Sequence, residues 1–557
     1  MALLQVIPPL ALFLLTPFLL APVSLAPFLL APPAARPASP PPAPPRYDYV
    51  VVGAGAAGSV VASRLTEDES VRVLVLEAGG PDDDPRIARP ADYRGLVGSE
   101  FDWKLSTEAE DHLAGRRIPW PRGRVWGGSG AISAMVYVRG PARDYDRWRD
   151  LGNEGWGFAD LLPYFRKAQD QERGPSIHHG TGGPQGVADP RWVPPLSLAF
   201  LDAAREVGLP RNDDWNGESP EGAGLFQLNQ RNGERHSTAA AYLRPALQRK
   251  NLTVVSHALV TRVLVRDGRA EGVAYVRDGQ EREARARREV ILCAGAVGSP
   301  QLLMLSGIGP AAHLRSLGLP VVLDRPGVGG NLQDHPRVAL TWESRVPLGL
   351  TPEDEEEAVR SWARDRTGPL TNPGVGAGAF VRTSPTLEVP DVQVVPTGNA
   401  AAGTYSLHVV LLHPASRGEI RLRSKDPAEA PVIRANYLAE PADLDGLVRG
   451  LAVARRIGEA PALAPFRGRQ RGPEPGAGEA ALRRHIRENA TTFFHPVGTC
   501  RMGDDPMAVV DAELRVHGVA GLRVIDASVM PALVGGATHA ATVAIAEKGA
   551  ALVKQGG

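Results

Sequence analysis

The chain has 557 residues, 43% apolar and 22% charged, a composition typical of a globular protein with more than one domain. Lys plus Arg and Asp plus Glu number 62 each, so the formal net charge is zero, whereas a nucleic-acid-binding protein is normally basic, and that class is set aside. Two cysteines, Cys293 and Cys500, cannot form a disulfide framework, and neither has neighbours at zinc-site spacing, so no metal is expected.

Residues 1–45 are expected to form a targeting or disordered Pro-rich segment outside the fold. Residues 2–35 carry no charge, and the hexapeptide PFLLAP at 17–22 recurs at 27–32. The prolines would break a membrane-spanning helix, and no basic residues precede the apolar stretch as in a signal peptide. Residues 32–45 are typical of an extended linker. A low-complexity extension without a role is an equal alternative.

A dinucleotide-binding unit is predicted next. The apolar run Tyr49–Val52 leads into a Gly-x-Gly-x-x-Gly turn, and a second apolar run, Val73–Leu76, ends in Glu77. The glycines permit a tight turn, close approach of a pyrophosphate and packing of helix on strand, while the helix N-terminus offers N–H groups to phosphate. Glu77 is placed to accept a hydrogen bond from a ribose hydroxyl. The turn consists of Gly53, Ala54, Gly55, Ala56, Ala57 and Gly58.

A second glycine-rich loop, at 120–130, contains Gly127, Gly128 and Ser129. Small residues let the backbone approach a flat ring or a phosphate closely. A glycine-rich surface loop explains the same pattern, and this segment taken alone favours that simpler interpretation.

Short elements are predicted through the middle of the chain. Ser237–Leu243 is predicted as a helix that Pro245 ends. Alternating strands between residues 336 and 440 indicate a mostly antiparallel sheet. The other predicted elements are strands at 252–255, 259–265, 272–276 and 289–295, helices at 301–306, around 442–457 and 478–489, a strand at 522–528 and an Ala-rich helix at 538–552.

Two histidines near the C-terminus are candidate catalytic groups. His495 lies in the segment FFHPVGTCRMG, and His539 begins the last predicted helix. A neutral imidazole can take the proton of an alcohol while a hydride leaves the alcohol carbon, and a second imidazole could hold the same oxygen. A structural role is the alternative for each histidine taken singly.

With these motifs in order, the chain resembles the glucose–methanol–choline oxidoreductases, a family of FAD-dependent alcohol-oxidising enzymes. Within this family the likeness is greatest to choline dehydrogenases, through RVWGG, AMVYVRG, LPYFRKAQ, ALAPFRG and the PVI…NYL pattern. The segments that carry the family resemblance span nearly all of 47–553 and are Val52–Gly58, Arg122–Gly140, Gly298–Pro310, Gly327–His335, His495–Gly503 and Val524–Lys548.

The resemblance implies an α/β fold with two domains. A discontinuous Rossmann-like FAD-binding domain would comprise residues 46–150, 251–335 and 491–557. A substrate domain built on an antiparallel sheet would comprise residues 151–250 and 336–490.

The resemblance also implies a role for each matched position. His495 matches the catalytic histidine of the family, and His539 matches the second catalytic position, which is His or Asn. Asp526 and Ala527 would lie beside the ribityl chain, and Val260 would contact the adenine side through its backbone. The ADP half of FAD would be held by Gly53, Ala54, Gly55, Ala56, Ala57, Gly58 and Glu77, and the flavin would be lined by Gly127, Gly128 and Ser129.

Three positions depart from the family pattern. Ser133 stands where the family usually has Asn, and Ala537 stands in a Gly-Asn-Thr-Asn-Ala-Pro pattern at the position of its first Asn. Ile132 stands where some relatives carry a histidine that binds FAD covalently, so non-covalent FAD is expected.

The expected reaction is the oxidation of a primary alcohol to an aldehyde by hydride transfer to FAD, with choline, oxidised to betaine aldehyde, as one candidate. The electron acceptor would be oxygen or a quinone. Membrane association stays open, and the chain would be mitochondrial if it follows the choline dehydrogenases.

Two alternatives to alcohol oxidation stay open. The first is a light-driven fatty-acid decarboxylase of the same fold, against which the positions of both cysteines count. The second is a flavin-binding relative without catalysis, against which the two histidines count.

Overall fold

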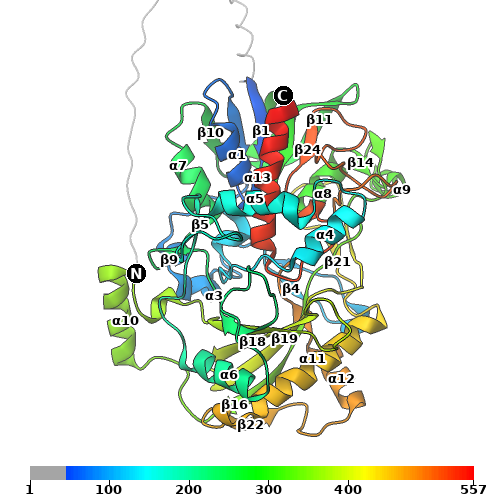
Figure 1. Cartoon of the computed structure of the whole chain (residues 1–557). Coiled ribbons are helices and arrows are strands. Elements are labelled where there is room, and N and C mark those ends of the chain that lie inside the picture. The colour runs from blue at the N-terminus through cyan, green and yellow to red at the C-terminus, as the bar shows by residue number, and fades with distance from the viewer. Residues whose placement is uncertain (1–45, 557) are drawn as a thin grey trace, which may run out of the picture. The chain divides into compact units, whose positions relative to one another are not determined.

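The computed structural model describes residues 46–556; the segment predicted to be targeting or disordered, at 1–45, lies outside the described residues. Two large sheets of opposite character form the framework of the described chain (Figure 1). The first is largely parallel and the second is antiparallel, which confirms the predicted α/β fold class with an FAD-binding layer and an antiparallel sheet.

The first sheet is the nucleotide-binding sheet predicted from the sequence. Its central strands are short apolar runs buried on both faces, as a parallel sheet between helices requires. The strands β1, β2, β10, β24 and the second half of β13 run parallel, and β11 and β12 form an antiparallel extension. In spatial order the strands are β10 (Leu252–Val255), β2 (Val73–Leu76), β1 (Arg46–Val52), β13 (Gln280–Leu292), β12 (Arg269–Arg277) and β11 (Leu259–Arg266), with β24 (Leu522–Val524) pairing β13.

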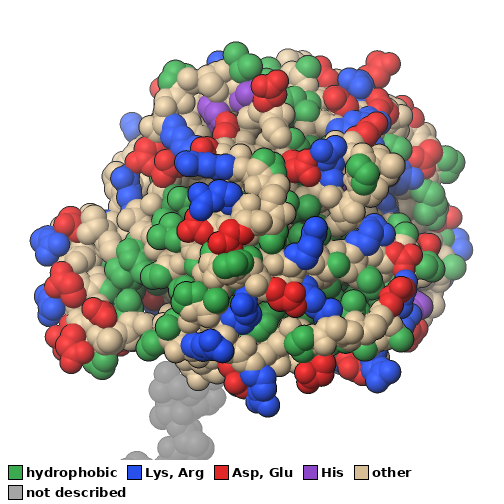
Figure 2. All heavy atoms as spheres, turned by 60° about the horizontal axis from the view of Figure 1, so that its bottom comes forward, with side chains coloured by type: hydrophobic (Ala, Val, Ile, Leu, Met, Phe, Trp, Pro, Cys, Tyr) green, Lys and Arg blue, Asp and Glu red, His purple; other side chains and the backbone are tan. Residues whose placement is uncertain are grey.

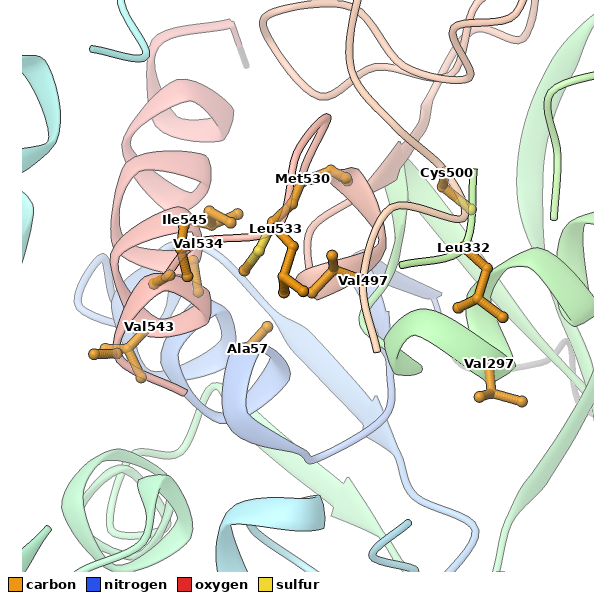
Figure 3. Close-up of a cluster of buried hydrophobic side chains, with 14 of the residues drawn as sticks. Ala57, Val297, Leu332, Val497, Cys500, Met530, Leu533, Val534, Val543 and Ile545 are labelled. Atoms are coloured by element: carbon orange, nitrogen blue, oxygen red, sulfur yellow. The ribbon is translucent and has the colours of Figure 1, made fainter. Parts of the chain in front are cut away.

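Helices from both ends of the described chain cover this sheet. The helix α1 (Ala56–Leu65) packs against α13 (Thr538–Gly556), and α5 (Phe158–Ala168) packs against α13 as well. A Cβ on Gly549 would lie 2.7 Å from Ile525, so this glycine lets α13 approach the end of β24. Figure 3 shows the resulting apolar cluster, in which Ala57 of α1 lies near Val497 and Leu533 from two loops.

The second sheet carries one covered face. Its strands alternate between fully and partly buried residues, and the fully buried side packs against α11 (Pro441–Glu459). Glycines of α11 allow this approach: a Cβ on Gly450 would lie 2.4 Å from Val409, and one on Gly458 would lie 2.5 Å from Trp342. In order the strands are β22 (Arg467–Arg471), β16 (Pro336–Ser344), β19 (Thr404–Leu411), β18 (Val392–Asn399), β17 (Ala377–Val381) and β7 (Gly222–Leu225), with β23 (Thr491–Thr492) pairing β16.

The remaining helices lie around these two sheets. The predicted domain boundaries stay a prediction, although α5 packs with the first layer and β23 joins the second sheet. The main further helices are α2 (Pro85–Ala88), α3 (Tyr93–Leu96), α4 (Ala142–Asp150), α6 (Pro195–Glu206), α8 (Gly295–Leu305), α9 (Ala311–Ser316), α10 (Pro352–Asp365) and α12 (Glu479–Asn489).

Two of the predicted helices were wrong in detail. A single π-helical turn, Ala239–Leu243, runs directly into α7 (Arg244–Ala246), so Pro245 does not end the helix. Pro245 occupies the first turn of α7, where a missing N–H costs little. The helix α8 begins at Gly295 rather than at residue 301, because the distant Asp526 accepts hydrogen bonds from the Gly295 amide at 2.9 Å and from the Ser299 hydroxyl at 2.6 Å.

The surface mixes both signs of charge. Figure 2 shows one face on which acidic and basic side chains alternate without a large region of one sign. Between residues 46 and 556, no helix is both long and apolar enough to cross a membrane. Within the same range, no three His, Cys, Asp or Glu side chains converge into a group that could hold a metal ion.

Candidate active site

The predicted dinucleotide turn has the geometry of a tight phosphate-binding loop. Gly53 has a φ of +99°, and its amide donates to the Leu76 carbonyl at 2.8 Å. A Cβ on Gly58 would lie 1.8 Å from the Gly53 oxygen, and one on Gly53 would lie 2.6 Å from the Cys293 oxygen. Strand, turn and helix are therefore pressed together at positions that only glycine fits.

Glu77 lies at the end of β2, as predicted, and holds the turn from below. Its carboxylate accepts from the Ala54 amide at 2.8 Å and from the Gly79 amide at 2.7 Å. Burial raises the pKa of this carboxyl above its usual value, while the two amides act in the opposite direction. The backbone of Ala258 donates to the Glu77 carbonyl at 2.8 Å, which brings the start of β11, with Val260, to the same end of the sheet.

The second glycine-rich loop lies directly on the dinucleotide turn. The Gly127 amide donates to the Ala54 carbonyl at 2.8 Å, and a Cβ on Gly128 would lie 2.8 Å from the Cα of Gly55. The hydroxyl of Ser129 accepts from the Gly123 amide at 3.1 Å. The loop predicted to line the flavin and the turn predicted to hold the ADP half thus form one continuous backbone surface.

The residues present fit FAD. The helix α1 begins at Gly55 without a side-chain cap, so its first amides are available to a pyrophosphate. The Asp526 carboxylate is engaged by α8 and by the Ser528 amide, so the backbone of Asp526 and Ala527 is what this segment offers a ligand. The neighbouring Ser528 hydroxyl is buried and has no hydrogen-bond partner among the described residues. These positions stay predictions for FAD contacts.

Ile132 lies at the end of the flavin loop in a small apolar cluster with Ile87, Leu96, Val125 and Ala131. No side chain in this cluster can form a bond to a flavin. We therefore expect acid precipitation of the yellow protein to release all FAD into the supernatant, measured by its absorbance. Flavin that stays with the precipitate would contradict non-covalent binding.

His495 and His335 form a directed pair. The Nε2 of His335 lies 2.9 Å from the Leu412 carbonyl, which only accepts, so this nitrogen carries the proton. The Nδ1 of His335 lies 2.9 Å from the Nδ1 of His495, and it must be the acceptor in a neutral ring. His495 then carries its proton on Nδ1, and its Nε2 keeps a free lone pair with no protein partner in the part of the chain that the structure describes.

Electrostatics keep both rings of this pair neutral. Burial, followed by the nearby charge of Arg122, lowers the pKa of His495 to about 3. Burial, followed by His495 and His413, lowers the pKa of His335 well below its usual value. At neutral pH the His495 Nε2 is therefore an unprotonated base.

Asp334 fixes the backbone beside this pair. Its carboxylate accepts from the His495 amide at 2.7 Å, from the Thr492 hydroxyl at 2.5 Å and from the Tyr437 hydroxyl. Sequence reasoning quoted Asp334 and His335 in a polar-tipped loop but gave them no role. An acid–histidine pair directly before a predicted strand was the available signal.

His539 lies in the first turn of α13, and its ring meets the flavin loop. A Cβ on Gly130 would lie 3.0 Å from the His539 ring. The Nε2 of His539 is buried without a partner among the described residues. Burial, followed by Arg235, lowers the pKa of His539 to about 4, so this ring is also neutral at pH 7.

The loops that carry the two predicted histidines are bonded to each other through Gln333. Its backbone pairs with Val497, its side chain accepts from the Leu533 amide at 3.1 Å, and it donates to the Pro531 carbonyl at 3.2 Å. Asn331 donates to the same Pro531 carbonyl at 3.3 Å. The predicted site thus draws on segments separated by hundreds of residues.

A matched pair of His335 variants tests the proton arrangement. Asn places an acceptor near the position of Nδ1, whereas Gln reaches only the position of Nε2. We expect His335→Gln to slow flavin reduction at least ~10-fold, a part of the contribution of a positioned base, and His335→Asn to slow it less. The rate is measured by anaerobic stopped flow between pH 5 and 9. A larger loss in His335→Asn would contradict the assigned tautomers.

Comparisons with known proteins agree with this geometry. Two family models described as GMC oxidoreductase match residues 47–337 and 414–546. The oxygen-dependent choline dehydrogenase of Pseudomonas fluorescens is 44% identical over 524 residues, covering 90% of this chain and 92% of that protein. The pyridoxine 4-oxidase structure from Mesorbium loti is 36% identical with a TM-score of 0.84, covering 91% and 98% of the two chains. The formate oxidase structure from Aspergillus oryzae, whose title names FAD, is 27% identical with a TM-score of 0.85, covering 92% and 98%.

Proposed function

The chain belongs to the GMC oxidoreductase family, and on this premise we propose that His495 is the base that takes the hydroxyl proton while a primary alcohol is oxidised to an aldehyde. The chain is an FAD-dependent enzyme that oxidises an alcohol. The observation that carries the role of His495 is the hydrogen-bond chain from Leu412 through His335, which leaves the His495 Nε2 unprotonated. The same chain orients the ring.

The chemistry divides between the cofactor and the protein. FAD, when bound, supplies an acceptor for the hydride from the alcohol carbon. His495 takes the hydroxyl proton on Nε2, and the O–H electron pair stays on oxygen to form the carbonyl as the hydride departs. His539 holds the same oxygen through its Nε2, which finds no other partner among the described residues.

The test of this function is flavin bleaching in the dark under anaerobic conditions. The holoenzyme is mixed with a panel of primary alcohols, and flavin absorbance and aldehyde are measured together. One aldehyde per reduced FAD supports the proposal. A flavin that stays oxidised with every alcohol, but drives loss of CO₂ from a fatty acid under blue light, would replace it with the decarboxylase.

Variants of His539 test its role in holding the oxygen. We expect His539→Ala to slow flavin reduction by about 100-fold, the range for loss of one donor to a developing charge. His539→Asn is expected to retain more activity, because an amide can still donate to the oxygen. Equal damage in the two variants, measured by anaerobic stopped flow, would remove the hydrogen-bonding role.

We also propose oxygen as the electron acceptor. The support is the similarity to a relative whose name includes oxygen dependence. Oxygen uptake that keeps pace with aldehyde formation, without any added acceptor, is the expected result. Turnover that needs an added quinone would contradict oxygen.

A further inference from the structure

The antiparallel sheet turns a polar, positively charged face toward His495. Along β16, β19 and β18 one set of residues is buried under α11, and the opposite set is partly exposed. Arg337, His408 and Thr397 belong to the partly exposed set, by the register of the three strands. The argument that follows rests on the proposed function, since it concerns the alcohol that reaches His495.

Arg337 is the strongest charge on this face. Its Nε donates to the Thr492 carbonyl at 3.0 Å, and one terminal nitrogen lies 3.4 Å from the Nδ1 of His408. His408 is neutral, because burial and then Arg337 lower its pKa well below the usual value. No carboxylate among the described residues lies within ion-pair distance of Arg337 (4.0 Å). A guanidinium with open donor positions next to a catalytic base is a ready partner for an anion.

The aromatic rings near the site are already covered by guanidinium groups. Phe493 lies edge-on to His495, with ring centroids 5.2 Å apart. The guanidinium carbon of Arg337 lies 5.7 Å from the centre of the Phe493 ring and 5.5 Å from that of Phe494. Trp126 is likewise faced by Arg244 at 5.8 Å. A quaternary ammonium group would have to displace one of these cations to reach an aromatic face.

Three further arginines add positive charge around the site. Arg122 acts on His495, Arg235 acts on His539, and Arg94 acts on both Arg337 and His408, each lowering the pKa of the group it faces. None of the three has a carboxylate within ion-pair distance among residues 46–556.

Two carboxylates offset part of this charge. Asp334 and Asp102 both act on Arg122. Asp334 is fully engaged by hydroxyls and the His495 amide, and Asp102 accepts from three backbone amides, those of Gly98, Lys104 and Arg122. The surplus is positive, so the site repels a cationic substrate and attracts an anionic one.

We propose that the substrate is an alcohol that carries a carboxylate, bound by Arg337, rather than choline. The planar guanidinium can bind both carboxylate oxygens, and the neutral His408 and the hydroxyl of Thr397 lie beside it. The alcohol end then reaches His495 past Phe493. The 44% identity to a choline dehydrogenase fixes the chemistry at the flavin, whereas these side chains set the charge of the substrate.

Binding of analogues that cannot be oxidised tests the proposal without turnover. The holoenzyme is titrated calorimetrically with 4-methylbenzoate, 4-methylbenzamide and 4-methylbenzylamine, which differ in charge but share a ring. We expect the carboxylate to bind at least tenfold more tightly than the amine. Arg337→Gln should abolish this preference and Arg337→Glu should reverse it, while Arg469→Gln, a change on the exposed edge strand β22, should leave it intact. Equal or tighter binding of the amine to the wild-type protein overturns the proposal.

Oxidation of a matched series separates this inference from the function on which it rests. Anaerobic flavin reduction is measured with 4-(hydroxymethyl)benzoate, benzyl alcohol, 4-(aminomethyl)benzyl alcohol and choline. Fastest reduction by the carboxylate at low concentration supports the proposal. Reduction by choline or by the amine at an equal or higher rate overturns the substrate class and leaves alcohol oxidation standing. A flavin that no alcohol reduces counts against the function itself, and the calorimetric preference then decides the anion site separately.

Discussion

His495→Ala is expected to slow flavin reduction by an alcohol at least ~100-fold while the protein keeps its FAD. The His495 Nε2 is the nitrogen with a free lone pair, and no other neutral base of the described chain is oriented by the pair with His335. Without it, the alcohol must lose its proton to water in a site whose own residues hold the pKa of that imidazole near 3. Anaerobic stopped flow gives the rate, and the flavin absorbance gives the cofactor content.

The control for this variant is His112→Ala, which removes an exposed imidazole from a surface turn. It should reduce flavin at the wild-type rate. If His495→Ala retained a rate within a few-fold of wild type with full FAD content, another group would have to be the base.

Gly58→Ala is expected to yield protein that has lost most of its FAD. The added Cβ would lie 1.8 Å from the Gly53 oxygen and 3.2 Å from the Cys293 side chain, so α1 must move away from β1. Such overpacking costs about 1–3 kcal/mol or more, and here it displaces the amides that face the pyrophosphate. The ratio of flavin to protein absorbance after purification measures the loss.

A glycine in open space serves as the matched control. A Cβ on Gly95, in α3, would meet no atom within 4 Å, so Gly95→Ala should keep a full complement of FAD. Full FAD content in Gly58→Ala would show that the turn tolerates a side chain and would remove it as the cofactor cradle.

The local parts of this site could be predicted from the sequence. The run from Tyr49 to Glu77 codes for strand, turn, helix and strand through its own glycines and apolar periods, and the structure has these elements where expected. His495 and His539 were found because they lie in segments that resemble a family. The structure places both beside the loops expected to hold the flavin, and their catalytic roles stay predictions.

The parts that failed depend on contacts between distant residues. His335 meets His495 across a separation of 160 positions, and no local pattern announces that pairing. The early start of α8 depends on Asp526, which follows it by more than two hundred residues. Pro245 was taken as a helix end because its place in the first turn of a new helix is decided by packing against α1. The charge of the substrate face became visible only once Arg337 was seen over the two phenylalanines.

The most direct test of the account is a single turnover with an alcohol deuterated at the reacting carbon. The holoenzyme is mixed in the dark, without oxygen, with the protiated or the dideuterated form of an alcohol that it oxidises, and flavin absorbance is followed. The account predicts slower reduction with the deuterated alcohol, one aldehyde for each FAD reduced, and a loss of both signals in His495→Ala. Flavin reduction without aldehyde, or a wild-type rate and yield in His495→Ala, would contradict hydride transfer assisted by this histidine.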